Sequence, residues 1–312
     1  MNSAGWLFAA IASAGLGVVA QYFPYDTDAP QSAEEIEKTR KYYADAYTPP
    51  SSGPEKAPTE YETRYLQVAK QAAETFDIEG QVKRFAEQYR LQRGAVLEIG
   101  SGRGYLQDVA ENYTGLDISS NVARFYHKKF VQGSATAMPF ADDSFDGAWS
   151  IWVLEHVPNP EHALTEIRRV MRDGGVVFLS PAWDCTPWAA EGYDVRPFSD
   201  FGLRGKLIKA SLPIRTHPLF AITERVSNRA LRSLASRMGG PTKFRYRKLE
   251  PNYKVYWQPD SDAVNRLDRY EAMLWFRSRG DECLSCDGDM GNVWMPSAPL
   301  VVRIHKSSGE PR

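Results

Sequence analysis

Residues 96–105 read Val-Leu-Glu-Ile-Gly-Ser-Gly-Arg-Gly-Tyr, an apolar run that contains Glu98 and is followed by glycines at alternate positions. The run predicts a buried strand, and the glycines predict a turn that leads into a helix near Gly104. Glycine takes positive φ without steric cost and lets a ligand approach the backbone. Because open α/β sheets bind ligands at the carboxyl ends of their strands, this stretch predicts a small-molecule pocket.

A second short run, Tyr113–Ile118, predicts another strand, with an acid at Asp117. Asp117 lies 17 residues after Gly100. That is close to the spacing of roughly 20 residues at which a carboxylate meets ribose hydroxyls in nucleotide-binding sheets. The alternative is that Asp117 caps a helix that begins near Ser119.

Further motifs follow along the chain. Residues 133–140 read Gly-Ser-Ala-Thr-Ala-Met-Pro-Phe, residues 145–150 read Phe-Asp-Gly-Ala-Trp-Ser, and residues 153–160 read Val-Leu-Glu-His-Val-Pro-Asn-Pro. With these motifs and the segment 164–175, the chain resembles the class I S-adenosylmethionine-dependent methyltransferases of the type 11 family. The resemblance covers about residues 94–184 and a last strand near 299–305.

The resemblance implies an α/β fold with a doubly wound, mostly parallel sheet that ends in an antiparallel seventh strand. Residues 113–117 and 176–180 are expected among the parallel strands, and an insertion is expected after the fifth strand, at about 185–260. The implied cofactor is S-adenosylmethionine, and the implied function is methyl transfer to a small-molecule acceptor.

The resemblance also assigns residues to the cofactor. Glu98 is expected to face its methionine end, and Asp117 its ribose hydroxyls. Ser134 stands where the family usually carries an acid that binds the adenine amino group, so adenine recognition is expected to be looser. The full set of expected cofactor residues is Glu98, Gly100, Ser101, Gly102, Gly104, Asp117, Ile118, Ser134, Ala135, Ser150 and Ile151.

Methyl transfer depends mainly on alignment of the acceptor with the reactive methyl group, and it requires no metal. A base is useful where the acceptor must lose a proton. His156 is the first candidate because its ordinary pKa of about 6.5 suits that task; the alternative is a histidine that packs under its loop. Asp184, after the fifth strand, is the second candidate, whereas Asp146 is expected to face the turn before its strand.

Two other classes of function remain as alternatives. A nicotinamide- or flavin-dependent oxidoreductase is disfavoured because its fingerprint is G-x-G-x-x-G, whereas the glycines here are spaced G-x-G-x-G. A non-catalytic module on the same fold is favoured only by the serine at position 134.

The charge of the chain is unevenly distributed. The net charge is −1, but residues 201–254 contain 13 Lys/Arg and 2 Asp/Glu. Within and beside this basic insertion, segments 198–213 and 220–238 mix apolar and basic residues as amphipathic helices do. Such a segment indicates an anionic partner, and we expect a membrane surface rather than nucleic acid because no nucleic-acid-binding motif is recognised.

The first residues strengthen the membrane expectation. Residues 1–24 contain an uncharged apolar stretch near the lower length limit for a spanning helix, so we expect a membrane anchor, with a signal peptide as the alternative. The first basic residues follow that stretch, which favours a cytoplasmic catalytic domain; a soluble cytoplasmic or peripheral protein is the alternative. Residues 25–59 are expected to be a linker, and 60–312 the methyltransferase domain.

The acceptor is therefore expected to be a lipid, a lipid-linked sugar or another membrane-proximal molecule. Cys283 and Cys286 have the spacing of a redox or zinc half-site, but no second pair completes four zinc ligands. We expect them, like Cys185, to be reduced structural thiols. The sequence gives no indication of the oligomeric state.

Overall fold

A computed structural model describes residues 32–44, 70–236, 241–286 and 298–306. The expected anchor, residues 1–24, lies outside these ranges. Among the helices within them, none is long and apolar enough to cross a bilayer.

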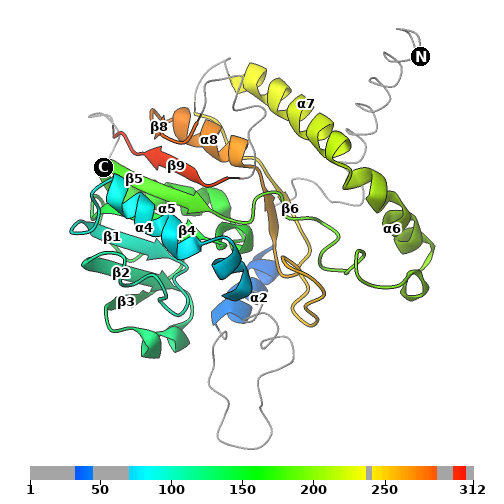
Figure 1. Ribbon diagram of the computed structural model, residues 1–312, viewed down its shortest axis with the longest axis horizontal. Helices are drawn as coiled ribbons and strands as arrows, with labels where there is room; N and C mark the ends of the chain where they lie inside the picture. The colour runs from blue at the N-terminus through cyan, green and yellow to red at the C-terminus, as the bar shows by residue number, and fades with distance from the viewer. Residues whose placement is uncertain (1–31, 45–69, 237–240, 287–297, 307–312) are drawn as a thin grey trace, which may run out of the picture.

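A seven-stranded sheet forms the centre of the domain (Figure 1). Its strand order is β3-β2-β1-β4-β5-β9-β8, with β1 to β5 parallel and β9 antiparallel to both of its neighbours. This confirms the expected mostly parallel sheet and its antiparallel last strand. The strands are β1 (Ala95–Ile99), β2 (Asn112–Asp117), β3 (Lys129–Gln132), β4 (Phe145–Ile151), β5 (Met171–Ser180), β8 (Glu282–Cys283) and β9 (Leu300–Arg303).

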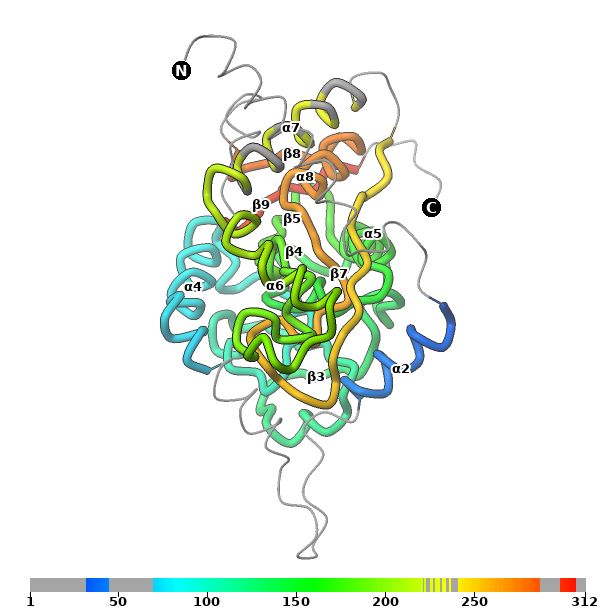
Figure 2. The backbone as a smooth tube through the Cα atoms, turned by 90° about the vertical axis from the view of Figure 1, so that its right-hand side faces the viewer, coloured from blue at the N-terminus to red at the C-terminus, as the bar shows by residue number. Residues whose placement is uncertain are grey.

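Helices cover both faces of the sheet, which is why β1 is apolar on both sides. Val96 packs with α4 (Ile78–Gln88), whereas Leu97 and Ile99 belong to the core formed with α5 (Pro160–Val170) and α8 (Arg269–Arg277). Figure 2 shows α4 and α5 on opposite sides. Helix α5 begins where the sequence signals it, because Asn159 caps it and Pro160 occupies its first turn.

The insertion after β5 contains two helices, α6 (Leu203–Arg215) and α7 (Pro218–Ser236), as its amphipathic pattern predicts. They lie to one side of the sheet (Figures 1 and 2). A short antiparallel ribbon of β6 (Tyr246–Lys248) and β7 (Asn265–Leu267) leads back towards the domain. The remaining described elements are α2 (Ala33–Ala44) and the 3-10 helices η1 (Ser120–Phe125), η2 (Leu154–His156) and η3 (Phe198–Asp200).

Three expectations need correction. No helix follows the glycine turn near Gly104; residues 102–109 form turns closed by short-range bonds such as Gly104 N–H to Ser101 O, because little chain separates them from β2. Part of the expected linker, residues 33–44, is helix α2, which packs on the domain through side chains described below. Cys283 and Cys286 form a disulfide, since the turn after β8 brings their Cα atoms to 5.6 Å.

Candidate active site

The glycine turn at the end of β1 has the positive φ values that its sequence predicts. Gly100, Gly102 and Gly104 have φ values of 70°, 49° and 68°. A Cβ on Gly100 would lie 2.2 Å from the side chain of Val153, so the turn also packs tightly against the segment after β4. The backbone amides of Gly100 and Ser101 both donate to the carbonyl oxygen of Leu116, which fixes the turn beside the end of β2.

Asp117 joins this turn to the loop after β2. Its Oδ2 accepts a hydrogen bond from the Gly102 amide at 2.8 Å, and its Oδ1 accepts one from the Ser119 amide at 2.9 Å. Burial raises the pKa of Asp117 even though these bonds oppose the shift. The carboxylate therefore caps the loop at Ser119, as the capping interpretation predicts. It also lies beside the glycine turn, where the cofactor interpretation places it.

Glu98 is buried on β1, the strand that pairs with β2 and its terminal residue Asp117. The hydroxyl of Tyr113 donates to its carboxylate, and burial raises the pKa of Glu98 to about 8. A carboxyl group with such a pKa stays largely protonated at neutral pH until a cation approaches. The expected methionine end of the cofactor carries positive charge, so this acid is suited to the role that the resemblance implies for it.

The remaining expected cofactor residues follow β3 and β4. Gly133 donates its amide hydrogen to the Asp117 carbonyl at 2.9 Å, which places the turn with Ser134 and Ala135 next to the end of β2. The Ser134 hydroxyl accepts from the Thr136 amide within that turn. Ser150, paired in register with Ile99, has a buried hydroxyl without a hydrogen-bond partner in the described part of the chain.

These features fit a nucleoside-containing cation. The glycine turn offers backbone without side chains, Asp117 lies where hydroxyls are expected, and Glu98 gains charge when a cation binds. The Ser150 hydroxyl is a buried polar group that a ligand would satisfy. Ile118 follows Asp117 directly, and Ile151 ends β4 at this same edge.

His156 lies in η2, immediately beyond this edge, in a buried polar cluster. Its Nδ1 is 2.7 Å from the hydroxyl of Tyr43, which in turn lies 2.9 Å from Asp262 Oδ2. Burial lowers the pKa of His156, but the negative charges of Asp262, Glu155 and Asp260 more than offset it, so the pKa lies above its ordinary value.

Hydrogen counting indicates which ring nitrogen of His156 accepts a proton. Tyr43 has one hydroxyl hydrogen, and Asp262 accepts it when ionised. The Nδ1–H of His156 then donates to the Tyr43 oxygen, and Nε2 is left as the basic nitrogen. Glu155 Oε1 lies 3.8 Å from that Nε2.

Helix α2 delivers Tyr43 and holds it in place. Its Glu35 pairs with Lys248 at 2.6 Å, Thr39 bonds the Tyr253 hydroxyl at 2.8 Å, and the Ala44 carbonyl accepts from the Ser119 hydroxyl at 3.0 Å. The helix thus bridges the loop after β2, the segment after β4 and the insertion. Sequence reasoning missed Tyr43 and Asp262 because they lie 113 and 106 positions from His156, with no local motif that marks them.

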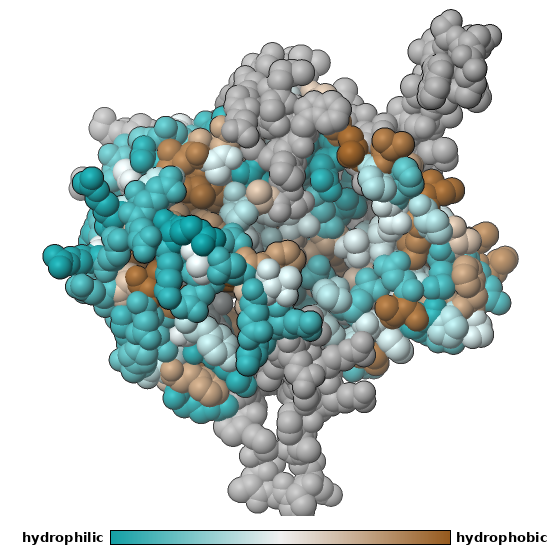
Figure 3. Space-filling view, viewed as in Figure 1, coloured by the Kyte–Doolittle hydropathy of each residue, from teal (hydrophilic) through white to brown (hydrophobic). Residues whose placement is uncertain are grey.

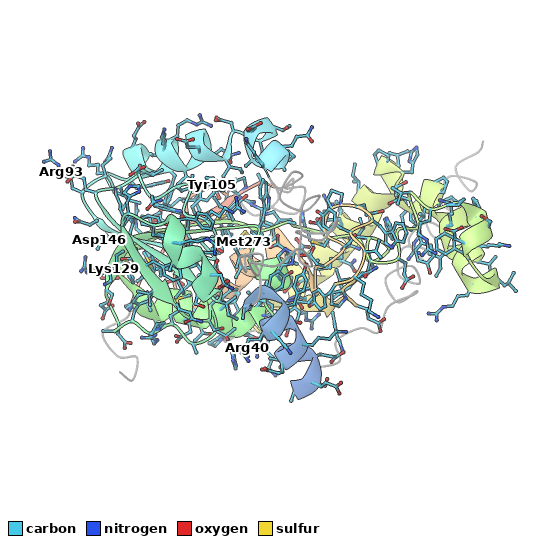
Figure 4. The ribbon with its side chains drawn as sticks, turned by 90° about the horizontal axis from the view of Figure 1, so that it is seen from below. Arg40, Arg93, Tyr105, Lys129, Asp146 and Met273 are labelled. Atoms are coloured by element: carbon cyan, nitrogen blue, oxygen red, sulfur yellow. A yellow bond between two sulfur atoms is a disulfide. The ribbon has the colours of Figure 1, made fainter. Side chains whose placement is uncertain are left out.

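The other acids singled out in the sequence lie in different environments. Asp184 pairs with Arg225 at 3.0 Å and Arg266 at 3.6 Å. These guanidinium groups occupy its carboxylate, so the structure favours a structural role over that of a base. Asp146 accepts from the Ala95 amide at 2.8 Å at the opposite end of the sheet, as expected. Figure 4 shows Asp146 near Arg93 and Lys129, away from Arg40 of α2.

Comparisons with known proteins agree with this geometry. Residues 97–179 match a family described as "Methyltransferase domain". Over 192 residues the chain is 28% identical to a fatty-acid O-methyltransferase of Mycolicibacterium smegmatis, a match that covers 55% of this chain and 69% of that protein. It is 38% identical over 81 residues to a ubiquinone/menaquinone biosynthesis C-methyltransferase of Hahella chejuensis, covering 26% and 32% of the two chains.

Among solved structures, the YcgJ protein of Bacillus subtilis matches 34% of this chain and 50% of its own, with 25% identity and a TM-score of 0.31. Apart from the Mycolicibacterium smegmatis protein, the matches to the first curated relatives span about a third of each relative's length. The matched region contains the glycine turn, Asp117, Ser150 and His156. Residues 97–179 are therefore similar to the methyltransferase domain that the sequence motifs predict, and the comparisons indicate an S-adenosylmethionine-dependent methyltransferase with S-adenosylmethionine as its cofactor.

Proposed function

We propose that this enzyme methylates an oxygen atom of a lipid-like acceptor at the cytoplasmic surface of a membrane. The observation that carries the proposal is the buried chain of hydrogen bonds from His156 through Tyr43 to Asp262, beside the end of β4. The relative named as a fatty-acid O-methyltransferase supports an apolar acceptor with a reactive oxygen.

The cofactor supplies an activated methyl group, and the residues around it position the acceptor and handle its proton. His156 Nε2 accepts the proton of an acceptor hydroxyl while the new O–CH3 bond forms and the S–CH3 bond breaks. The negative charges of Asp262, Glu155 and Asp260 stabilise the imidazolium that results. Tyr43 keeps the ring in the required tautomer and closes one side of the site through α2.

The test is turnover of the full-length protein with radiolabelled cofactor and a panel of fatty and hydroxylated lipids in detergent. With hydroxyl acceptors, which must lose a proton, we expect His156→Asn to lower kcat by about 10²-fold or more and Tyr43→Phe by about tenfold, with cofactor affinity nearly unchanged. In the parent, kcat should rise with pH through the raised pKa of His156, and this dependence should vanish in the variant.

His162→Asn is the matched control, because His162 lies exposed on α5. It should leave both turnover and pH profile unchanged. Full activity of His156→Asn at neutral pH would show that positioning alone drives catalysis, and methylation of none of the oxygen acceptors would refute the proposed acceptor class.

A further inference from the structure

Helix α6 is apolar on two opposite faces, and one of them packs on the part of the protein that the structure describes. Gly205, Ile208 and Leu212 are buried against the domain. On the other side, Leu203, Leu207 and Ile214 leave 78%, 61% and 62% of their surface exposed. With the exposed Ala210 they follow i, i+4, i+7 and i+11 spacing, so they form one stripe along the helix. A stripe of large exposed apolar residues indicates a partner.

The stripe continues onto the first turns of α7, where Leu219 and Ile222 are 70% and 43% exposed. Hydrophobic residues are visible on the right-hand side of Figure 3, where Figure 1 places α6 and the start of α7. We call the residues Leu203, Leu207, Ala210, Ile214, Leu219 and Ile222 the α6–α7 stripe.

The charged residues of the segment that carries most of the stripe are all basic. Residues 201–223 contain four Lys/Arg and no Asp or Glu. Arg204 and Lys206 are exposed and lie on either side of Leu203 and Leu207 around the helix. An apolar stripe flanked by basic side chains is the pattern of helices that lie in the interface of an anionic bilayer.

Only part of the basic insertion has this orientation. Farther along α7, the guanidinium groups of Arg225, Arg229 and Arg232 contact Asp184, Asp268 and Glu271 of the domain at 3.0, 2.7 and 2.9 Å. Those three arginines hold α7 to the protein, and the acid-free segment 201–223 surrounds the exposed stripe.

We infer that the α6–α7 stripe docks this enzyme on an anionic lipid bilayer, with α6 lying in the interface and Arg204 and Lys206 among the headgroups. This inference rests on the proposed lipid-like acceptor, because docking on the bilayer brings the enzyme to the place where such an acceptor is found. A nucleic acid does not account for the large aliphatic residues at the centre of the basic segment.

The test places an environment-sensitive fluorophore on the full-length protein at Leu207→Cys, with Val255→Cys as the matched control. Val255 is also an exposed aliphatic residue, 41% exposed, and lies outside the stripe. Of the natural cysteines, Cys185 is buried and the other two are joined in a disulfide, so the introduced thiol is labelled preferentially. Because the probe reports on its own surroundings, membrane binding through another part of the chain does not imitate the signal.

With phosphatidylglycerol-containing vesicles we expect a blue shift and a several-fold rise in emission at position 207, and little change at position 255. Phosphatidylcholine vesicles should give a weaker response, and salt should reduce the anionic one. Arg204→Gln with Lys206→Gln should weaken binding to anionic vesicles by about tenfold or more.

Two outcomes would overturn the inference. One is an unchanged probe at position 207 while the protein sediments with the vesicles. The other is a concentration-dependent blue shift without vesicles, which would show that a second copy covers the stripe. Methyl transfer in detergent is measured separately, so loss of membrane contact is distinguishable from failure of the proposed reaction.

Discussion

At the scale of single residues, Gly102 combines a positive φ, which favours glycine, with a hydrogen bond to Asp117 beside the glycine turn. Its φ is 49°, and its amide donates to Asp117. Valine at this φ is strongly disfavoured, and its branched side chain would project from a turn that must admit a ligand. We expect Gly102→Val to weaken S-adenosylmethionine binding by about 10–100-fold, measured by calorimetry, because the side chain occupies space that the ligand needs; this corresponds to roughly 1.4–2.7 kcal/mol of binding free energy.

Gly174→Val separates strain from ligand contact. Gly174 also has positive φ, at 79°, but a Cβ there meets nothing within 4 Å, and the residue lies near the start of β5, away from the cofactor turn. This control should lose stability and keep its cofactor affinity. Unchanged affinity in a folded Gly102→Val protein would remove the turn from the binding site.

The residues that sequence reasoning identified are those with local signatures. The glycine turn and Asp117 lie at strand ends separated by one short connection, so spacing alone places them together. Tyr43 and Asp262 reach His156 only through the packing of α2 and the insertion, which no spacing encodes. The C-x-x-C pair was misjudged because its spacing suits a reduced pair and a disulfide equally well.

At the scale of elements, α7 shows why periodicity predicts a helix and not its orientation. Its arginines at 225, 229 and 232 form a regular polar stripe that is expected to face outward. Instead they contact acids of the domain, and Arg229 is only 2% exposed. These acids, Asp184, Asp268 and Glu271, are distant in sequence. The sequence of the helix alone therefore does not indicate that its arginine face packs on the protein. The helix predicted after the glycine turn is absent for a different reason. Its local sequence pattern favours a helix, but the short connection to β2 leaves little chain in which to form one.

This arrangement makes Arg229 important for stability. Its guanidinium bonds both carboxylate oxygens of Asp268, the residue that caps α8. We expect Arg229→Met to lower the free energy of unfolding by about 2–4 kcal/mol in urea titrations, because it leaves a partly buried carboxylate without its partner. Lys206→Met, on the exposed side of α6, should change it by less than about 0.5 kcal/mol. Equal stabilities of the two variants would contradict the inward role of α7.

At the scale of the whole molecule, the functional edge of the sheet concentrates acids that are costly to bury in ionised form. Burial raises the pKa of Glu98 to about 8 and that of Glu155 to about 7. His156 also has a raised pKa, because nearby carboxylates outweigh its burial. All three groups bind protons more tightly in the folded chain than in the unfolded one. Their contribution to the free energy of unfolding therefore falls as pH rises.

The sign of the pH dependence follows. Between the unfolded carboxyl pKa of about 4.5 and the folded values, the native state binds more protons than the unfolded state, so stability falls as pH rises. The contribution of His156 is complete below about pH 6.5 and is lost as pH rises through its folded pKa. Glu35, whose pKa its bond with Lys248 lowers to about 2, acts in the opposite direction but only in more acidic solution.

We therefore expect the cofactor-free protein to lose about 2–5 kcal/mol of unfolding free energy between pH 5.5 and 8.5, measured by urea denaturation. Glu98→Gln with Glu155→Gln should flatten this slope, because both amides stay neutral, and should make the variant more stable than the parent at pH 8.5. S-adenosylmethionine should also reduce the slope in the parent, since its positive charge favours ionised Glu98. A stability that rises over this pH range, or a slope that the double substitution leaves unchanged, would show that these carboxyl groups are ionised in the folded protein without a ligand.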